Sequence, residues 1–435
     1  MIIREIIFSE GFKNKYRREE KNFTRERKMN FKETILFQLK SSGKSLGIEL
    51  SNYIKEIKET LTEYSKQAYS KARMKIKYEG YIELNDALLK EYYNNEYKRY
   101  KSYRLLGEDG SDIHLQHGEE IRKEFGSINK NKNMVNASKS TVVYDLLNHL
   151  VIDSKLNRHS VSERECAIEQ LKKLKEEGKQ KKDILVADRG FPSLEMFIEL
   201  EKMGYDFVIR YSGNNFLRET ISLVNSSEND KTIEISLRNG SRREENKAIK
   251  AHLRQGYSET IKLRILKIEL PKGTTEYLIT SLIDKEEFGI EDFKLIYNYR
   301  WNEETYFDFQ KNVMHIEDFT GKTVESIKQD YYSKILVGNL HSLIVADAQK
   351  EVDEEIKNKP KLKYKKYKVN KNITFGLMKE SIYNLLNEDN NNWQKEYEAL
   401  VQEAKKFTNA VRENRSYPRK KKGNLKYPLN KKRAF

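Results

Sequence analysis

This chain has very little cysteine and proline and no long apolar run. Its 435 residues include five prolines and one cysteine, Cys166. A single cysteine excludes an intrachain disulfide and a cysteine-based zinc cluster, so an intracellular protein is expected. The longest apolar candidate, residues 335–348, is interrupted by Asn339, His341 and Ser342. It falls short of the roughly 20 apolar residues that span a bilayer. No membrane-spanning segment is therefore expected.

Histidine is also scarce, with seven residues scattered along the chain. His114 and His117 are three residues apart, but no further ligand lies close to them in the sequence. A surface or turn role is therefore favoured over a zinc site. The first twelve residues, MIIREIIFSEGF, lack the long apolar core and small-residue cleavage site of a secretory signal, so none is expected.

Positive charge is what the chain has in excess. Lys and Arg number 83 against 67 Asp and Glu, which gives a formal net charge of +16 and a pI near 9.3. Such an excess favours a polyanionic partner, and without a membrane segment we expect nucleic acid. Hydrophobic residues make up 37% and charged residues 34% of the chain. This balance predicts a globular protein of two or three domains.

The first hundred residues are predicted to form a helical DNA-binding domain. Residues 1–30 are charged, and they are interpreted either as a solvated tail or as a basic arm lying on DNA. Apolar residues at helical spacing then predict helices over 31–39 and 46–54. A third helix, 66–77, carries cations on one side, and the arrangement resembles a helix-turn-helix. These cations are Lys66, Lys71, Arg73, Lys75 and Lys77.

The middle of the chain alternates strand and helix signals, which predicts a mixed α/β fold around a central sheet. Strands are expected near 103–109, 141–147, 150–156, 184–188 and 206–211. The first is expected to end on Asp109 before a turn, and residues 128–135 are expected to form a polar loop. Ser162 and Glu165 predict a capping box for the following helix, and Pro192-Ser193 begin another.

The expected domains follow from these signals. An α/β core over 101–212 is interrupted by a β-rich insertion over 213–286, whose last two strands form a hairpin through residues 271–274. The core resumes over 287–348 with one long helix, 290–313. A basic C-terminal region, 349–435, completes the chain.

One stretch of the long helix combines cations, a phenol and a carboxylate. Tyr297, Arg300, Glu304 and Lys311 follow the spacing Y-x2-R-x3-E-x6-K. At about 100° per residue they fall within roughly 60° of one another, on a single helical face. A carboxylate among phosphate-binding cations indicates metal-assisted chemistry on a phosphodiester.

The other carboxylates of such a site are expected at strand ends, where sites form in open α/β sheets. Asp109, Asp188 and Glu304 would offer hard oxygen ligands, which suit Mg²⁺ or Mn²⁺. Two such ions roughly 3.5–4 Å apart can promote phosphoryl transfer. Each residue could instead have a purely structural role. Asp109 could accept a hydrogen bond in a plain turn, and the nearby Asp112 is an alternative to it as the ligand. Asp188 could cap the following helix, and Glu304 could form an i,i+4 ion pair with Arg300.

These residues resemble those of the DDE transposases of insertion-sequence family four, over most of residues 30–345. The matching pieces are Asp109-Gly-Ser, Asp188-Arg-Gly-Phe191, the Y-R-E-K signature, and SIKQDYYSKILVGN at 326–339. The resemblance implies a ribonuclease H-like core with a β insertion before the catalytic helix. It implies that Asp109, Asp188 and Glu304 are catalytic and bind the metal, Mg²⁺ or Mn²⁺. DNA phosphates would be held by Tyr297, Arg300, Lys311 and Arg189.

The same resemblance implies what the protein acts on. Similar enzymes bind double-stranded DNA at terminal inverted repeats, cut it, and join the freed 3′ ends to a target, usually as homodimers or larger assemblies. A cytoplasmic, nucleoid-associated location is expected. The alternatives are a ribonuclease H-like nuclease or resolvase that does not join DNA, and a decayed copy that only occupies transposon ends.

Two positions depart from the family pattern. The residue before the catalytic glutamate is commonly apolar but here is Glu303, which leaves Glu303 and Glu304 as competing ligands. Only Glu304 fits the signature spacing. The segment Asp112 to Gln116 lacks the proline often found there.

The basic end of the chain generates a first prediction. Deleting residues 418–435, which contain PRKKKGNLKYPLNKKR, should lower the salt dependence of DNA binding without changing sequence preference, because lysines there would contact phosphates only. Affinity measured by fluorescence anisotropy at several salt concentrations checks this. An unchanged salt slope would contradict it.

Overall fold

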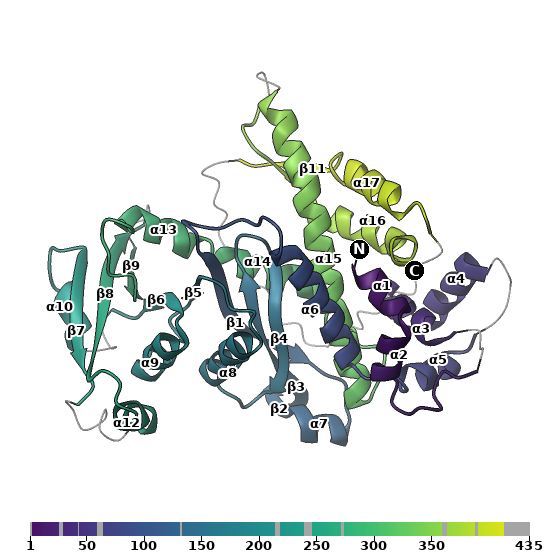
Figure 1. The fold of residues 1–435 in the computed structure, drawn as a ribbon, viewed down its shortest axis with the longest axis horizontal. Helices are drawn as coiled ribbons and strands as arrows, with labels where there is room; N and C mark the ends of the chain where they lie inside the picture. The colour runs from purple at the N-terminus through teal and green to yellow at the C-terminus, as the bar shows by residue number, and fades with distance from the viewer. Residues whose placement is uncertain are drawn as a thin grey trace. The chain divides into compact units, whose positions relative to one another are not determined.

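The computed structural model describes residues 2–25, 29–41, 43–58, 64–130, 133–213, 218–238, 246–270, 274–358, 363–387 and 390–412. The basic end from residue 418 lies outside these ranges. Contacts divide the chain into two compact units. The first comprises 1–96, 114–124 and 308–435, and the second 97–113 and 125–307. Figure 1 shows their elements in chain order.

The second unit is built on a large mixed sheet (Figure 1). Its order is β2-β3-β1-β5-β6-β9-β8-β7, with β4 paired to β3. β5 runs parallel to both β1 and β6, whereas β4, β9, β8 and β7 join by antiparallel pairing. The predicted mixed α/β class is confirmed. The strands are β1 Arg104–His114, β2 Ser127–Lys130, β3 Asn133–Asp145, β4 Leu150–Arg158, β5 Asp183–Ala187, β6 Asp206–Tyr211, β7 Asp230–Ser236, β8 Thr260–Glu269 and β9 Thr275–Thr280.

Two predictions about this sheet are wrong. β1 does not end on Asp109 but continues to His114, because it has β3 as a neighbour as well as β5. Residues 128–135 are not a polar loop. The described residues 128–130 and 133–135 are the end of β2 and the start of β3, which pair antiparallel with Ile128 opposite Val135, whereas 131–132 lie outside the described residues. A polar sequence concealed this hairpin, since exposed strands need few apolar residues.

The β-rich segment between residues 213 and 286 extends the central sheet. Thr280 of β9 lies opposite Val208 of β6 on one side and opposite Arg264 of β8 on the other. The predicted hairpin between β8 and β9 is confirmed, although its tip, 271–273, lies outside the described residues. Its described residues also include the helices α10 Arg218–Val224 and α12 Lys247–Arg254.

Helices pack on the core strands. α8 (Glu163–Glu176) lies on β3 and β4, α9 (Leu194–Met203) lies on β6, and α13 (Ile290–Asn298) contacts β6 and β8. All five residues of β5 are buried, as the apolar run between Asp183 and Asp188 predicts. Ser193 caps α9 by accepting a hydrogen bond from the Met196 N–H. Ser162 begins α8 without a side-chain cap bond, so the predicted capping box is not formed.

The first unit is mainly helical. It contains the 34-residue helix α15 and one small antiparallel sheet of β10 and β11. No described helix is both long enough and apolar enough to cross a membrane. Its elements are α1 Ile2–Phe8, α2 Glu10–Tyr16, α3 Phe31–Lys40, α4 Leu46–Lys58, α5 Lys66–Arg73, α6 Glu79–Tyr93, α15 Val324–Lys357, β10 Tyr367–Val369, α16 Lys371–Leu386, α17 Trp393–Ala404 and β11 Thr408–Ala410. Two further helices, α7 Glu119–Phe125 and α14 Trp301–Asn312, begin in one unit and end in the other.

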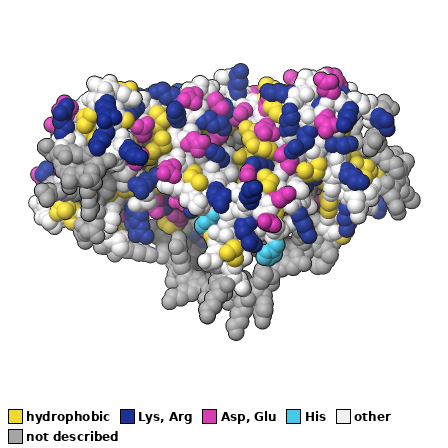
Figure 2. Space-filling model, turned by 90° about the horizontal axis from the view of Figure 1, so that it is seen from below, with side chains coloured by type: hydrophobic (Ala, Val, Ile, Leu, Met, Phe, Trp, Pro, Cys, Tyr) yellow, Lys and Arg dark blue, Asp and Glu magenta, His cyan; other side chains and the backbone are white. Residues whose placement is uncertain are grey.

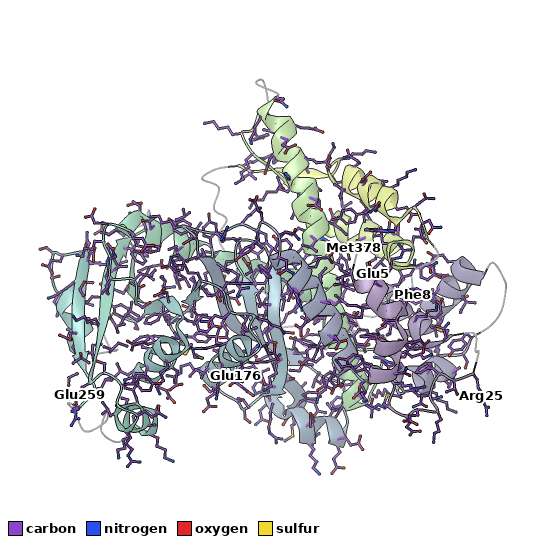
Figure 3. All side chains as sticks on the ribbon, viewed as in Figure 1. Glu5, Phe8, Arg25, Glu176, Glu259 and Met378 are labelled. Atoms are coloured by element: carbon purple, nitrogen blue, oxygen red, sulfur yellow. The ribbon has the colours of Figure 1, made fainter. Side chains whose placement is uncertain are left out.

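The start of the chain is neither a solvated tail nor an extended arm. Ile3 and Ile7 of α1 and Phe12 of α2 are buried, and Ser9 caps α2 through the Phe12 N–H. Side chains fill the interior of the unit, including Met378 of α16, which is labelled in Figure 3. Each of these helices has only seven residues, and so short an apolar segment fits a strand as well as a helix, which is why the sequence did not reveal them.

Arg73, predicted to face DNA from the third helix, is buried inside the first unit. It donates to Asp330 Oδ1 at 2.8 Å, to Gln329 Oε1 at 2.8 Å and to the Ser326 carbonyl at 2.9 Å. It therefore ties α5 to α15. Lys66 and Lys71 of the same helix remain exposed. Figure 2 shows Lys and Arg across the drawn face, interleaved with Asp and Glu.

This buried pair generates a second prediction. Arg73→Met should destabilise the protein by about 3–5 kcal/mol, because it leaves the Asp330 carboxylate buried without its cation. Urea denaturation monitored by circular dichroism measures the change. Lys71→Met, an exposed cation on the same helix, is the matched control and should change stability by less than about 0.5 kcal/mol. Equal effects would contradict the role assigned to Arg73.

Candidate active site

The register of two parallel strands positions the first two carboxylates. β1 and β5 pair from Arg104 opposite Asp183 to Gly107 opposite Val186. Asp109 and Asp188 each lie two residues further along their strands, so they leave the paired region at the same level. Both side chains project at the carboxyl end of the β1–β5 pair, where sites form in α/β sheets.

A buried ion pair specifies this register at the opposite end. The Arg104 guanidinium donates to Asp183 through Nε at 2.8 Å and through a terminal nitrogen at 3.0 Å. Both residues are almost fully buried. A shift by one residue would leave two buried charges unpaired, which is strongly unfavourable. The ion pair therefore keeps Asp109 level with Asp188.

The helix that carries the motif is interrupted. The predicted single helix over 290–313 is two helices, α13 and α14, with Arg300 in the turn between them. In that turn the Arg300 N–H donates to the Tyr297 carbonyl and the Glu303 N–H to the Arg300 carbonyl. Such i→i+3 bonds tighten the backbone to about three residues per turn. Tyr297, Arg300 and Glu304 therefore do not share the face of one regular helix, and that prediction is wrong.

The Arg300 side chain gathers all three predicted carboxylates. Its terminal nitrogens lie 3.8 Å from Asp109 Oδ2 and 3.8 Å from Asp188 Oδ2, and one of them also donates to Glu304 Oε1. The Arg300 side chain is 9% exposed, whereas the three carboxylates are 28–35% exposed. The carboxylates thus converge on one cation and remain open to solvent on their other sides.

Tyr297 lies on the Asp188 side of this group. Its hydroxyl donates to Asp188 Oδ1 at 3.4 Å, and the side chain is buried. Burial raises the pKa of Tyr297 to about 12, and the Asp188 carboxylate adds to this, against the opposing charge of Arg300. Tyr297 therefore stays protonated and can orient one Asp188 oxygen while the other faces Arg300.

Asp109 has an unusual proton affinity. Burial raises its pKa to about 6, although the Gly110 N–H bond and the Arg300 charge act in the opposite direction. The neighbouring carboxylates of Glu163 and Asp188 raise the pKa further. Cation binding at Asp109 therefore competes with a proton near neutral pH.

Glu303 and Glu304 occupy different environments. Glu304 shares the Arg300 guanidinium with the two aspartates, whereas Glu303 is fully buried beside Gly107. Neither carboxyl oxygen of Glu303 has a hydrogen-bond partner among the described residues, and the same is true of Glu108. Burial and the nearby Asp109 charge raise the pKa of Glu303 well above its usual value. Glu303 thus occupies the commonly apolar position of the motif, and its burial disfavours the charged form of the carboxyl.

The two remaining motif cations lie differently. Arg189 is exposed, and its backbone N–H donates to Asp188 Oδ1 at 2.6 Å. Lys311 lies on α14 after Glu304, beyond the end of the second unit. Within the first unit its charge helps lower the pKa of Glu317. The structure therefore brings Tyr297 and Arg300 to the carboxylates, but Lys311 is not placed relative to them.

A polar cluster beside Asp109 was missed by sequence reasoning. Lys139 Nζ lies 2.8 Å from Glu163 Oε1 and 3.8 Å from Asp112 Oδ1, which also lies 3.1 Å from His159 Nε2. Asp112, the competitor of Asp109, therefore has partners of its own. Asp112 lies in β1, Lys139 in β3, His159 just after β4 and Glu163 at the start of α8. Asp112 and Lys139 are far in the sequence from each other and from the other two, so no motif spacing could have identified the cluster.

The donor set of the site suits a hard divalent cation. The three carboxylates offer only oxygen, as Mg²⁺ and Mn²⁺ prefer, and they face one common point. As the side chains lie, no three Asp, Glu, His or Cys residues of the described chain are close enough together to hold a metal ion. The Arg300 guanidinium lies among Asp109, Asp188 and Glu304, the three carboxylates that would hold such an ion.

The sequence comparison assigns the class of protein. The transposase DDE domain matches residues 102–340, which is more than half of the chain. The chain belongs to this family of DDE transposases, enzymes of DNA transposition that use divalent metal ions.

The fold is similar to that of piggyBac transposase in a synaptic complex with hairpin DNA, with a TM-score of 0.47 and 11% sequence identity. The similarity covers 94% of this chain and 85% of that one. No curated protein sequence matches the chain.

The contact between Gly107 and Glu303 generates a third prediction. A Cβ atom on Gly107 would lie 2.5 Å from Glu303 Oε2 and 2.9 Å from Leu146 Cδ2. Gly107→Ala should therefore lower stability by about 1–3 kcal/mol through overpacking. In a Glu303→Ala background the same substitution should cost less, because the carboxyl is gone. Denaturation of the four proteins in this cycle measures the difference. Additive effects would contradict the contact.

Proposed function

We propose that this chain is a DNA transposase of insertion-sequence family four. It binds the terminal inverted repeats of its own element, cleaves DNA at the ends and joins the 3′ ends to target DNA. The observation that carries the proposal is the convergence of Asp109, Asp188 and Glu304 on the Arg300 guanidinium. These carboxylates come from separate elements, and the family to which the chain belongs uses divalent metal ions.

Each carboxylate has a role in this proposal. Asp109, Asp188 and Glu304 would hold Mg²⁺ or Mn²⁺, and two bound ions would supply activation of the attacking oxygen and stabilisation of the leaving one. The Tyr297 hydroxyl orients Asp188 by donating to Oδ1. Asp109 would have to be deprotonated to hold a cation, and because burial raises its pKa to about 6, a proton would compete with the metal in mildly acidic solution.

Tyr297, Arg300, Lys311 and Arg189 would contact DNA phosphates. Arg300 suits this role because a planar guanidinium binds phosphate through two parallel hydrogen bonds. Arg189 suits it because it is exposed directly after Asp188. The net charge of +16 favours DNA as the partner at longer range.

The wider organisation follows from the same proposal. The sheet order β4-β3-β1-β5-β6 is the ribonuclease H-like core, and β9, β8 and β7 are the inserted strands that extend it. In the N-terminal region, the exposed Lys66 and Lys71 of α5 are the cations left to face DNA. The protein would act as a homodimer or larger assembly on DNA, in the cytoplasm at the nucleoid.

The proposal is tested by strand transfer on duplexes made from the inverted repeats flanking the gene. Glu304→Gln and Asp188→Asn should each lower cleavage at least about a hundredfold, since the ions they hold contribute several kcal/mol. Glu303→Gln is the matched control, because this neighbouring carboxyl is buried and does not contact Arg300, and it should retain cleavage.

The products decide between transposase and nuclease. Joined donor and target molecules are expected, whereas cut but unjoined ends would favour a nuclease or resolvase. Full cleavage by Glu304→Gln together with loss in Glu303→Gln would reverse the assignment of the two glutamates.

A further inference from the structure

The Arg300 side chain lies at the position that a bound cation would have to share. We propose that Arg300 is an internal competitor of the divalent cation, and that a DNA phosphate relieves this competition by drawing the guanidinium away. The inference rests on the proposed function, since it takes Asp109, Asp188 and Glu304 as the cation ligands. It adds that metal binding and DNA binding are coupled through one side chain.

The geometry supports a shared position. An ion held by three carboxylates must contact one oxygen of each, and the guanidinium already does so or nearly does so. It lies within 3.8 Å of Asp109 Oδ2 and of Asp188 Oδ2 and is hydrogen-bonded to Glu304 Oε1. With Arg300 there, no three ligating side chains of the described residues approach closely enough to hold a metal.

Charge explains why the guanidinium stays there without DNA. Three carboxylates that face one another repel, and each would gain a proton or a counter-ion. Arg300 supplies one positive charge to all three, and it is 9% exposed. A buried guanidinium must keep anionic partners, because an unpaired buried charge is very unfavourable. Arg300 can therefore leave the carboxylates only for another anion.

A DNA phosphate is the anion that fits. The guanidinium binds phosphate and carboxylate with the same two-pronged geometry, so the exchange conserves its hydrogen bonds. Arg300 lies in the short turn between α13 and α14, where its long side chain can change direction without moving either helix. Once the guanidinium turns to a phosphate, it no longer lies between the three carboxylates, and their oxygens can bind a cation.

This exchange makes two bindings cooperative. DNA removes a competitor of the cation, so it raises cation affinity. By linkage the cation raises DNA affinity by the same factor. The consequence is protective, since the site assembles its metal ions only when a phosphate backbone is in place.

The first experiment measures Mn²⁺ binding to the full chain without DNA, by electron paramagnetic resonance of the free ion. Arg300→Gln removes the positive charge and the paired N–H donors of the guanidinium. This variant should bind Mn²⁺ more tightly than the natural protein by roughly 5- to 150-fold, which is the usual range of coupling between two binding sites. Arg300→Met is measured beside it, so that the result does not depend on one variant folding, which circular dichroism checks.

A control variant tests whether the effect arises because Arg300 occupies the cation position or merely because a positive charge is lost. Arg189→Gln removes one positive charge next to Asp188, but only the Arg189 backbone N–H contacts that carboxylate in the structure. It should change Mn²⁺ affinity much less than Arg300→Gln does. Equal gains in the two variants, or no gain at Arg300, would overturn the inference. Adding Asp188→Asn to Arg300→Gln should abolish the gain, and a gain that persists would also overturn it.

A second experiment compares the natural protein with Arg300→Gln in the presence of DNA. The terminal-repeat duplex should raise the Mn²⁺ affinity of the natural protein, after subtraction of Mn²⁺ bound by the duplex, and should raise that of Arg300→Gln much less. An equal rise in both would overturn the inference. Cleavage of the duplex is scored separately: failure to cleave contradicts the proposed function, whereas unchanged Mn²⁺ affinity in a cleaving protein contradicts only the role of Arg300.

Discussion

The parallel pairing of β1 with β5 is the constraint on which the candidate site depends. A buried, bidentate ion pair between Arg104 and Asp183 stands at one end of this pairing. At the other end, Asp109 and Asp188 lie at the same level, two residues beyond the last paired positions of β1 and β5. The backbone register therefore converts one interaction in the core into the relative position of two carboxylates. Any slip would separate these carboxylates and leave buried charges unpaired.

Placing several acids together has consequences for the rest of the site. Arg300 compensates Asp109, Asp188 and Glu304 directly, whereas burial and the nearby Asp109 charge raise the pKa of Glu303 well above its usual value. The crowded carboxyls are thus accommodated in two ways, three of them by a shared cation and the fourth by burial that disfavours its charged form.

Much of the core could be predicted from local patterns. The apolar run before Asp188 predicts a buried strand, and β5 is buried along its whole length. The hairpin of β8 and β9 and the mixed sheet follow from similar signals. The helices of the first sixteen residues, the extension of β1 and the hairpin of β2 with β3 were missed. The extension of β1 and the β2–β3 hairpin are made mostly of polar residues, and the first two helices have only seven residues each, so these structures depend on neighbours rather than on local pattern.

The sequence by itself determined which chemical groups are present and at what spacing, including the Y-R-E-K signature and the aspartates at 109 and 188. It left Glu303 and Glu304 open, and it placed Arg73 among the DNA-facing cations. The tertiary structure decided that Arg73 is an internal ion-pair partner of Asp330, that Glu303 is buried, and that Arg300 lies among three carboxylates. The reason is physical: burial and charge pairing depend on elements up to about 250 residues apart, which local spacing does not encode.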